Sequence, residues 1–314
     1  MQQLSIIIPN YNGAHLLQRC LSSVASSKAN LEEVLVVDDA GTDGSVEMLR
    51  EQFTQVRVIA RETNGGFSVA VNEGIRSTSG EFVVLLNSDV EVTPGFLDTI
   101  MPLFQDETVF AVSPRILLPS RGGMDEGAKT GAWYHGMFYA DQRQGVTEVT
   151  PILYTAGSAT VYRRSMLEAL GGFDEAYSPY YWEDTDLGFR AWKRGWRSLY
   201  QPLSTVHHGH SASISRMNVR RTNSIKARNS LFFIWRNIED EGLLRQHRLW
   251  LPAVLLKRAV LCDTASLAGW TSALARRKEA ALAKKLDSRH RRLSDREIFE
   301  TVGVPLDAGT AGDL

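Results

Sequence analysis

The residues best suited to chemistry in this sequence are carboxylates and histidines that follow apolar runs. The apolar run at 82–86 stops at Asn87-Ser88-Asp89, so an aspartate follows a strand expected to be buried on both faces. In open α/β sheets, ligands bind beyond the carboxyl ends of the strands. Asp89 therefore suggests a site for a divalent cation and a diphosphate. A plain polar turn is the structural alternative.

A second candidate group is His207-His208-Gly209-His210, which follows a short apolar run. Neutral imidazole, one carboxylate and phosphate oxygens form a suitable ligand set for Mg²⁺ or Mn²⁺. Because side chains alternate along a strand, His208 and His210 are expected on one face and His207 on the other. In regular strand geometry, therefore, not all three histidines can bind the same ion. Ordinary surface or core histidines are the alternative.

Acidic residues are also concentrated in Glu183-Asp184-Thr185-Asp186, at the expected start of a helix. The helix dipole stabilises a first-turn carboxylate as an anion, which keeps it available as a base. Asp186 and Arg190 are spaced i,i+4, so an ordinary salt bridge is the favoured interpretation of that pair. The preceding aromatic residues, Trp182 among them, suit either a sugar face or a core.

Two further groups are candidates for binding a nucleotide. Asp38-Asp39 follows the apolar run 34–37, and a carboxylate there can accept hydrogen bonds from a base or a ribose. Capping of the next loop or helix is the alternative. Asn64-Gly65-Gly66 opens a helix, where glycines let a backbone approach a phosphate, although a tight turn explains them equally well. The P-loop and dinucleotide-binding glycine motifs are absent from the sequence.

The first hundred residues supply a scaffold for these groups, because strand-like runs alternate with helical patterns. Strands are expected at 5–8, 34–37, 56–60 and 82–86, and helices at 15–24, 45–52 and 67–75. This order predicts a parallel sheet with right-handed crossovers. Each loop after a strand lands on the same edge, which should gather Tyr11, Asp38, Asp39, Arg61 and Asp89. The middle is less regular, with a helix expected at 96–104, an aromatic hairpin at 133–139 and short strands at 196–200 and 205–208.

Composition limits the class of protein and its surroundings. The 314 residues are 43% hydrophobic, and a net charge of −1 gives no reason to expect nucleic acid as a partner. The two cysteines, Cys20 and Cys262, fit a reducing compartment. The chain enters a strand-like run without a signal peptide, and its apolar runs are far short of the roughly 20 residues that cross a bilayer. A cytoplasmic protein is therefore expected.

The charge is unevenly distributed, because residues 244–297 contain thirteen Lys/Arg against five Asp/Glu. The pattern from residue 216 onward is helical. Within it, an apolar stretch flanked by cations suits an amphipathic helix lying on an anionic bilayer. The alternative is a helix packed on the body or on a second subunit of a homodimer. The residues concerned are Trp250, Leu251, Val254, Leu255 and Leu256 with Arg245, Arg248, Lys257 and Arg258.

Seven stretches taken together resemble family 2 glycosyltransferases of the GT-A fold. The likeness is closest to the rhamnosyltransferase-like enzymes of bacterial cell-envelope polysaccharide synthesis, and it covers about residues 4–235. It lies in Ile6-Ile7-Ile8-Pro9-Asn10-Tyr11-Asn12, Val36-Val37-Asp38-Asp39, Asn64-Gly65-Gly66-Phe67, Leu86-Asn87-Ser88-Asp89, Gly171-Gly172-Phe173-Asp174-Glu175, Glu183-Asp184-Thr185-Asp186-Leu187 and His207-His208-Gly209.

The resemblance implies a Rossmann-like α/β fold with a mostly parallel central sheet and a C-terminal helical extension. The expected division is a GT-A domain at 1–238 and a basic helical tail at 239–314. Within the domain, 1–110 would form the nucleotide-sugar half and 111–238 the acceptor half.

The resemblance also implies an inverting transfer from a nucleotide-diphosphate sugar, with a rhamnose-like deoxyhexose favoured. The acceptor would be a saccharide or a lipid-linked saccharide, which places the enzyme at the cytoplasmic face of the inner membrane. Asp184 would be the general base, and Asp89 with His207 or His208 would bind Mg²⁺ or Mn²⁺. The nucleotide would be held by Pro9, Tyr11, Asp39, Arg61, Asn64, Gly65 and Asn87, and the acceptor by Trp182, Glu183 and Asp186.

The sequence departs from the family at Asn87, where an aspartate is usual, and this removes one anion from the expected metal site. Two other functions remain open. A nucleotidyltransferase would need a basic glycine-rich loop near the N-terminus, and the sequence has none. A catalytically silent nucleotide-sugar-binding or scaffold protein would have no turnover for an Asp184→Asn substitution to remove.

Overall fold

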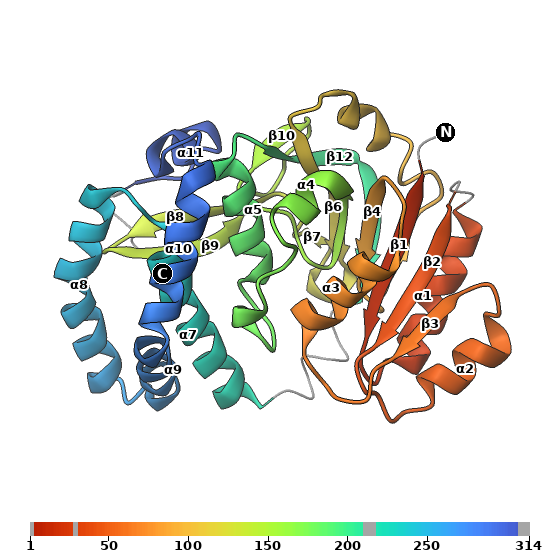
Figure 1. Ribbon diagram of the computed structural model, residues 1–314, viewed down its shortest axis with the longest axis horizontal. Coiled ribbons are helices and arrows are strands. Elements are labelled where there is room, and N and C mark those ends of the chain that lie inside the picture. Colours follow the sequence, from red (N-terminus) through yellow and green to blue (C-terminus); the bar gives the residue numbers. More distant parts are fainter. Residues whose placement is uncertain (1–2, 28–30, 210–217, 307–314) are drawn as a thin grey trace.

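The computed structural model describes residues 3–27, 31–209 and 218–306. Its centre is a ten-stranded sheet with the main order β10-β12-β6-β11-β4-β1-β2-β3, and β5 and β7 pair with β12 and β6 (Figure 1). The strands of this sheet are β1 Leu4–Asn10, β2 Glu33–Asp38, β3 Arg57–Ala60, β4 Phe82–Leu86, β5 Val90–Val92, β6 Val109–Leu118, β7 Met124–Asp125, β10 Thr150–Ile152, β11 Ala159–Arg163 and β12 Arg197–His208.

The N-terminal strands β3, β2, β1 and β4 are all parallel, as the strand and helix alternation predicts. Beyond β4 the sheet is mixed, because β11 runs antiparallel between β4 and β6. The predicted α/β fold with C-terminal helices is confirmed. Its helices are α1 Ala14–Ser26, α2 Ser45–Gln52, α3 Phe67–Ser77, α4 Arg164–Ala169, α5 Glu183–Lys193, α7 Val219–Asn237, α8 Glu241–Val260, α9 Thr264–Ala275, α10 Arg277–Asp287 and α11 Asp295–Thr301.

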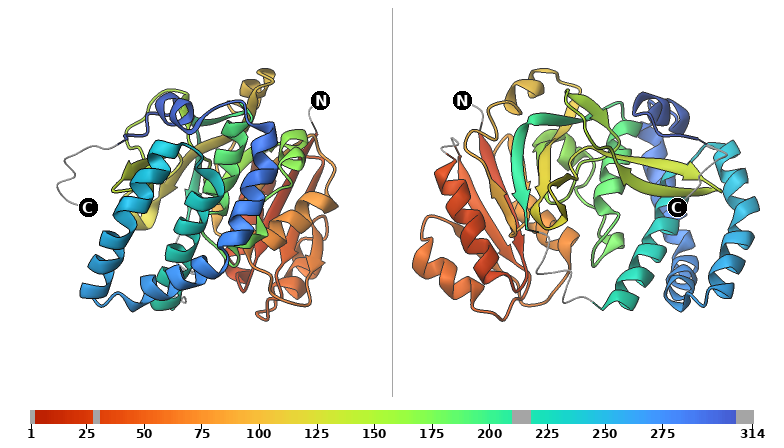
Figure 2. Two further views of the ribbon diagram at one scale, coloured as in Figure 1. Left: turned by 60° about the vertical axis from the view of Figure 1, so that its left-hand side comes forward. Right: turned by 180° about the vertical axis from the view of Figure 1, so that it is seen from behind.

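Helices cover both faces of the sheet. Helix α1 lies behind the sheet in Figure 1 and in front of it in the reversed view of Figure 2, whereas α3 and α4 lie on the opposite face. Alternate residues of the buried strand β4 pack into the two layers. Phe82, Val84 and Leu86 join one core cluster, and Val83 and Leu85 join the other. The strand expected to be buried on both faces is therefore the centre of the core.

A third core cluster is rich in aromatic residues and joins the C-terminal helices to the body. It includes Trp133 and Phe138 of the hairpin formed by β8 Lys129–Tyr134 and β9 Met137–Gln142, together with Phe189, Phe233 and Phe299. The hairpin expected at 133–139 is confirmed. Leu251, Val254 and Leu255 of α8 also pack against this cluster, so these three apolar residues face the body.

Two expectations for the middle of the chain are wrong. Residues 96–104 form turns and a short 3₁₀ helix, Met101–Gln105, and no α-helix. The two short strands expected at 196–200 and 205–208 are one strand, β12, with an irregular register between Gln201 and Thr205. Residues 202–204 have no partner in the β6 register and form a bulge, and pairing with β6 on both sides of the bulge makes the two segments one strand.

Candidate active site

The carboxyl ends of β1, β2 and β4 lie at one edge of the sheet, because their pairing is parallel and in register. Asn10 at the end of β1 is paired with Asp38 at the end of β2. Pro9 is half-buried within β1, and the side chain of Tyr11, just past its end, is 55% exposed. An exposed aromatic ring at this edge is available to stack on a base.

Asp39 holds together the loops that were expected to bind the nucleotide. Its carboxylate accepts hydrogen bonds from Arg61 Nε at 2.9 Å, Gly65 N at 2.9 Å and Gly66 N at 2.8 Å. Asn64 Nδ2 also donates to the Asp39 carbonyl at 3.1 Å. These contacts are those of a loop cap. A carboxylate has about four acceptor positions, so Asp39 retains capacity for one further donor.

Gly66 joins this loop to the segment before α5. Its φ of +86° lies in a region that favours glycine, and an added Cβ would come within 2.6 Å of the Pro179 carbonyl oxygen. Phe67 N donates to the same oxygen at 3.0 Å. The start of α3 is therefore fastened to the chain that leads into the acidic turn at 183–186.

Asp89 and His208 come together at the end of β12. His208 is paired with Val90 of β5, and Gly209 N donates to the Asp89 carbonyl at 2.8 Å. His208 Nε2 lies 3.2 Å from Asp89 Oδ1, and His208 Nδ1 lies 2.6 Å from Glu126 Oε1. The imidazole is thus held between two carboxylates that are distant in sequence.

Burial opposes the charge of His208, but the hydrogen bonds to Asp89 and Glu126 outweigh it and raise the pKa of His208 to about 9. A carboxylate on one ring nitrogen with the other nitrogen facing a second ligand is the arrangement that orients metal-binding histidines. Within the described residues, no three His, Cys, Asp or Glu side chains form a complete cation site. Asp89 and His208 therefore fit a site whose other ligands are diphosphate and water.

His207 lies away from Asp89, whereas Asn87 contacts the 157–158 turn. His207 is exposed on the opposite face of β12, so it is not brought to Asp89. His210 lies outside the described residues. Asn87 N donates to the Ser158 carbonyl at 2.8 Å, which places the residue at the junction of β4 and the strand β11 beside it.

Helix α5 begins with the carboxylates Glu183 and Asp184. Asp184 Oδ1 accepts from Thr185 N at 2.7 Å, and its Oδ2 accepts from Gly157 N at 3.3 Å. Glu183 is buried, and its Oε2 atom has no hydrogen-bond partner. The two neighbouring carboxylates therefore have very different hydrogen bonding.

This difference in hydrogen bonding affects the pKa values of the two carboxylates differently. Burial and then the charge of Asp184 raise the pKa of Glu183 to about 8. Burial also raises the pKa of Asp184, but the charge of Lys129 and the N–H groups of Thr185 and Gly157 oppose that rise. Burial without a partner for Oε2 therefore favours the protonated form of Glu183. The N–H groups and the positive charge near Asp184 favour its charged form.

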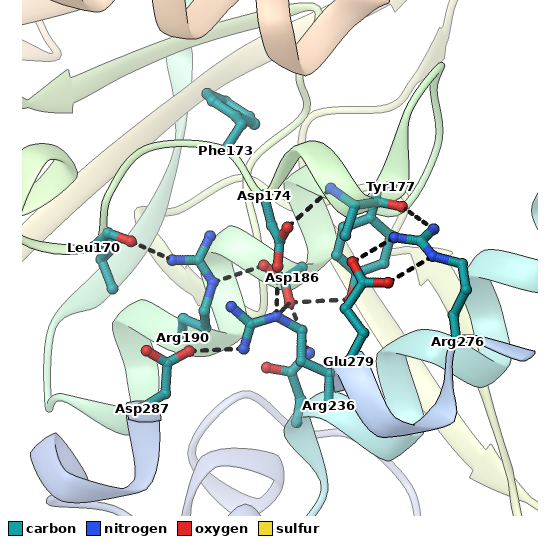
Figure 3. Close-up of polar contacts among 12 residues, drawn as sticks. Leu170, Phe173, Asp174, Tyr177, Asp186, Arg190, Arg236, Arg276, Glu279 and Asp287 are labelled. Carbon is teal, nitrogen blue, oxygen red and sulfur yellow. Dashed lines mark hydrogen bonds and ion pairs between the residues drawn. The ribbon is translucent and has the colours of Figure 1, made fainter. Parts of the chain in front are cut away.

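Asp186 lies in a network of ion pairs and hydrogen bonds (Figure 3). The predicted salt bridge with Arg190 is confirmed at 2.6 Å, and Tyr177 Oη and Asn237 Nδ2 also donate to Asp186. Arg236 Nε lies 3.3 Å from its Oδ1. The fully buried side chain is not placed to touch an acceptor. Asp186 instead holds α5 against its neighbours.

Trp182 also contributes to packing. Its backbone has a φ of +80°, and its half-buried ring lies 5.4 Å from that of Phe233 and 6.1 Å from that of Phe138, between centroids. Tyr181 has a φ of +72° as well. Two consecutive non-glycine residues in this region form a strained turn that sets the direction in which α5 begins.

Glu126 and Lys129 are the site residues that no sequence pattern identified. Ser158 Oγ donates to Glu126 Oε1 at 3.3 Å, and Lys129 Nζ lies 3.8 Å from Glu126 Oε2. Gly157, next to Ser158, contacts Asp184. Short contacts therefore run from Asp89 through His208, Glu126 and the 157–158 turn to Asp184. Of the residues expected at the metal site and as the base, these contacts join Asp89, His208 and Asp184 and leave out His207. Sequence signals existed for these three residues but not for Glu126 or Lys129.

Comparisons with known proteins agree with this arrangement. The family model for glycosyl transferase family 2 matches residues 5–171. The chain is 30% identical over 242 residues to N-acetylglucosaminyl-diphospho-decaprenol L-rhamnosyltransferase of Mycobacterium tuberculosis, covering 68% of this chain and 78% of that protein.

Two solved structures share the fold. GalNAc-T7 with UDP, GalNAc and Mn²⁺ superposes with a TM-score of 0.70 at 18% identity, covering 96% of this chain and 57% of the other. The mannosyltransferase PcManGT of Pyrobaculum calidifontis with GDP-Man and Mn²⁺ gives 0.53 at 20% identity, covering 90% and 87%. At these identities the likeness establishes the GT-A fold.

Proposed function

The chain belongs to glycosyl transferase family 2, and from this premise we propose that it transfers a rhamnose-like deoxyhexose from a nucleotide-diphosphate donor, with inversion. The observation that carries the proposal is the continuous set of contacts from Asp89 and His208 to Asp184 at the carboxyl edge of the sheet. A donor and an acceptor must meet in such a place, where ligands of open α/β sheets bind.

In this mechanism Asp184 takes the proton of the acceptor hydroxyl as that oxygen attacks the anomeric carbon. The bond from the anomeric carbon to the diphosphate oxygen breaks, and its electron pair leaves with the diphosphate. Attack from the side opposite the leaving group inverts the anomeric configuration. The raised pKa of Asp184 makes it a stronger base than a free aspartate. Protonated Glu183 can donate a hydrogen bond that orients the acceptor.

Asp89 and His208 would hold the divalent cation, Mg²⁺ or Mn²⁺, and Glu126 would keep the imidazole turned toward it. When bound, such an ion neutralises charge on the leaving diphosphate. The bound Mn²⁺ in both solved structures and the carboxylate on His208 Nδ1 support this role. Tyr11, Asp39, Arg61 and the 64–65 turn would hold the nucleotide.

The acceptor would be a saccharide carried on a lipid diphosphate, as the name of the mycobacterial relative suggests. With that acceptor the enzyme would act at the cytoplasmic face of a membrane. No helix among the described residues is both long and apolar enough to cross one.

The substitution Asp184→Asn tests the catalytic assignment. We expect the turnover number to fall by about 10² to 10⁴, because general-base catalysis contributes that much. Donor binding, measured by titration calorimetry, should stay unchanged. Asp141→Asn, at an exposed position of β9, is the matched control. If wild-type protein shows no turnover with any donor yet binds one, the protein is a silent nucleotide-sugar-binding member.

A thermal-shift panel tests the donor site. UDP, GDP, dTDP and CMP are each added with and without Mg²⁺ or Mn²⁺. We expect one nucleoside diphosphate to raise the melting temperature in a metal-dependent manner, because ligands that bind only the folded state stabilise it. The absence of any such rise would refute the donor-site assignment.

A further inference from the structure

Helix α8 has apolar residues on two of its sides. On the inner side, Leu243 and His247 are buried, and Leu251 and Leu255 pack on the aromatic cluster. Trp250 stacks on His135 with ring centroids 4.0 Å apart. The inner side therefore accounts for most of the apolar residues that suggested an amphipathic helix, and it is already covered by the body.

The outer side carries a second apolar row. Leu249, Leu256 and Val260 are 72%, 64% and 73% exposed. They are spaced seven and four residues apart, with exposed Ala253 between them, so they lie on one side of the helix. Folding leaves this row in contact with water, which costs free energy unless something covers it.

Cations border the apolar row. Arg245 and Arg248 lie on the helix before it, and exposed Lys257 lies beside it. The acid of α8, Glu241, pairs with Arg248 at 3.3 Å, where both side chains are largely exposed. Such a pair is weak and leaves the face positive.

We propose that this outer face, formed by Arg245, Arg248, Leu249, Leu256, Lys257 and Val260, binds the surface of an anionic lipid bilayer. The apolar row would enter the boundary between headgroups and acyl chains, and the cations would meet lipid phosphates. A second copy of this chain fits less well, because two such faces would bring like charges together.

The position of α8 relative to α5 bears on the proposed reaction. Figures 1 and 2 show that the C-terminal end of α8 and the N-terminal ends of α5 and α7 point to the same side of the molecule. An open groove of about 330 Å³ lies between α7 and α9 on that side, lined by Arg220, Arg221 and Ile225 among others. The value of this placement rests on the proposed function: the apolar row ends at the C-terminal end of α8, on the side of the molecule to which the first turn of α5 points.

Vesicle sedimentation with the full chain tests the proposal. The probes are vesicles of phosphatidylcholine alone and vesicles with about one third phosphatidylglycerol. We expect binding only to the anionic vesicles, and release by high salt. The double substitution Leu256→Ser with Val260→Ser should weaken binding about tenfold or more, because these side chains would lose their burial. Lys257→Ala should weaken it about fivefold.

Two control substitutions show whether binding is specific to the outer face of α8 and independent of catalysis. Leu203→Ser removes a leucine of β12 that is 77% exposed, and it should leave binding unchanged. Asp184→Asn should bind vesicles like the wild type, so failure of the proposed activity would not be mistaken for failure of docking. Equal binding to neutral vesicles, no binding, or an equal loss in Leu203→Ser would overturn the proposal. A dimer in sedimentation velocity that Leu256→Ser dissolves would overturn it in favour of a second copy.

Discussion

Helix α5 carries two carboxylates, Glu183 and Asp186, that are three residues apart in sequence and have opposite surroundings. Asp186 is surrounded by Arg190, Arg236, Tyr177 and Asn237, and Arg190 and Arg236 lower its pKa despite burial. Glu183 has a buried oxygen without a partner, and its pKa is raised to about 8. Within the described residues, no lysine or arginine forms an ion pair with Glu183 or Asp184.

The difference shows how one helix serves two purposes. The cations around Asp186 come from α5 itself and from α7, and Arg236 continues to Asp174 and to Asp287 of α10 at 2.7 Å each. C-terminal helices outside the sequence motifs thus hold α5 in place. Among the residues that the structure describes, Glu183 and Asp184 form no ion pair, and the more distant charge of Lys129 opposes the rise in the pKa of Asp184. Perturbed carboxylates of this kind are common at functional sites.

Removing Arg236, which pairs with Asp186, should have the largest effect on the free energy of unfolding. Arg236→Ala leaves the carboxylates of Asp174 and Asp287 without their arginine and weakens the neutralisation of Asp186. Removing one partner of a buried ion pair costs about 3–5 kcal/mol. Urea unfolding should show this loss, whereas Arg248→Ala, in an exposed pair, should change the free energy of unfolding by no more than about 0.5 kcal/mol. Equal effects of the two substitutions would refute the assigned role.

Replacing Glu183, which has no cationic partner, by a neutral residue should instead increase the free energy of unfolding at high pH. Glu183 binds its proton more tightly in the folded chain than in the unfolded one, so its contribution to stability is present below its unfolded pKa and is lost as the pH rises through about 8. Glu183→Gln removes that loss. The substituted protein should be more stable than the wild type above about pH 8, by on the order of a few kcal/mol.

Urea unfolding of the wild type and of Glu183→Gln, measured from acidic pH to above about pH 8, checks this prediction. The titrations of distant groups such as His208 are shared, so the difference between the two curves reports Glu183 together with its effect on neighbouring Asp184. If the difference in the free energy of unfolding between the two proteins did not change with pH, the raised pKa of Glu183 would be contradicted.

The smallest effect on the free energy of unfolding is expected for a substitution of Glu126, which should instead change metal affinity. Glu126→Gln keeps the size of the side chain but weakens its hold on His208 Nδ1. Loss of such an outer carboxylate reduces metal affinity about 10- to 100-fold. Titration calorimetry with Mn²⁺ and a nucleoside diphosphate measures this, and Glu148→Gln, at an exposed position, is the control. Unchanged Mn²⁺ affinity would show that Glu126 does not orient a metal ligand.

The parallel part of the sheet and the carboxylates at its edge could be predicted from the amino-acid pattern alone. Apolar runs that end in Asp38-Asp39 and in Asp89 mark strand ends, and parallel strands deliver their ends to one edge. The Asp186–Arg190 pair also followed from spacing along one helix. These are local signals, since period and register within an element depend on neighbouring residues.

Contacts between side chains of different elements could not be predicted in this way, because they depend on long-range packing. Glu126 contacts His208 from 82 residues away, and no pattern around either residue specifies that contact. The same holds for Arg236 with Asp186, and for α8, whose composition is apolar and basic on both sides. Which side became the outer face depended on the aromatic cluster that the helix covers. Long-range packing chooses among faces and partners that local patterning leaves equivalent.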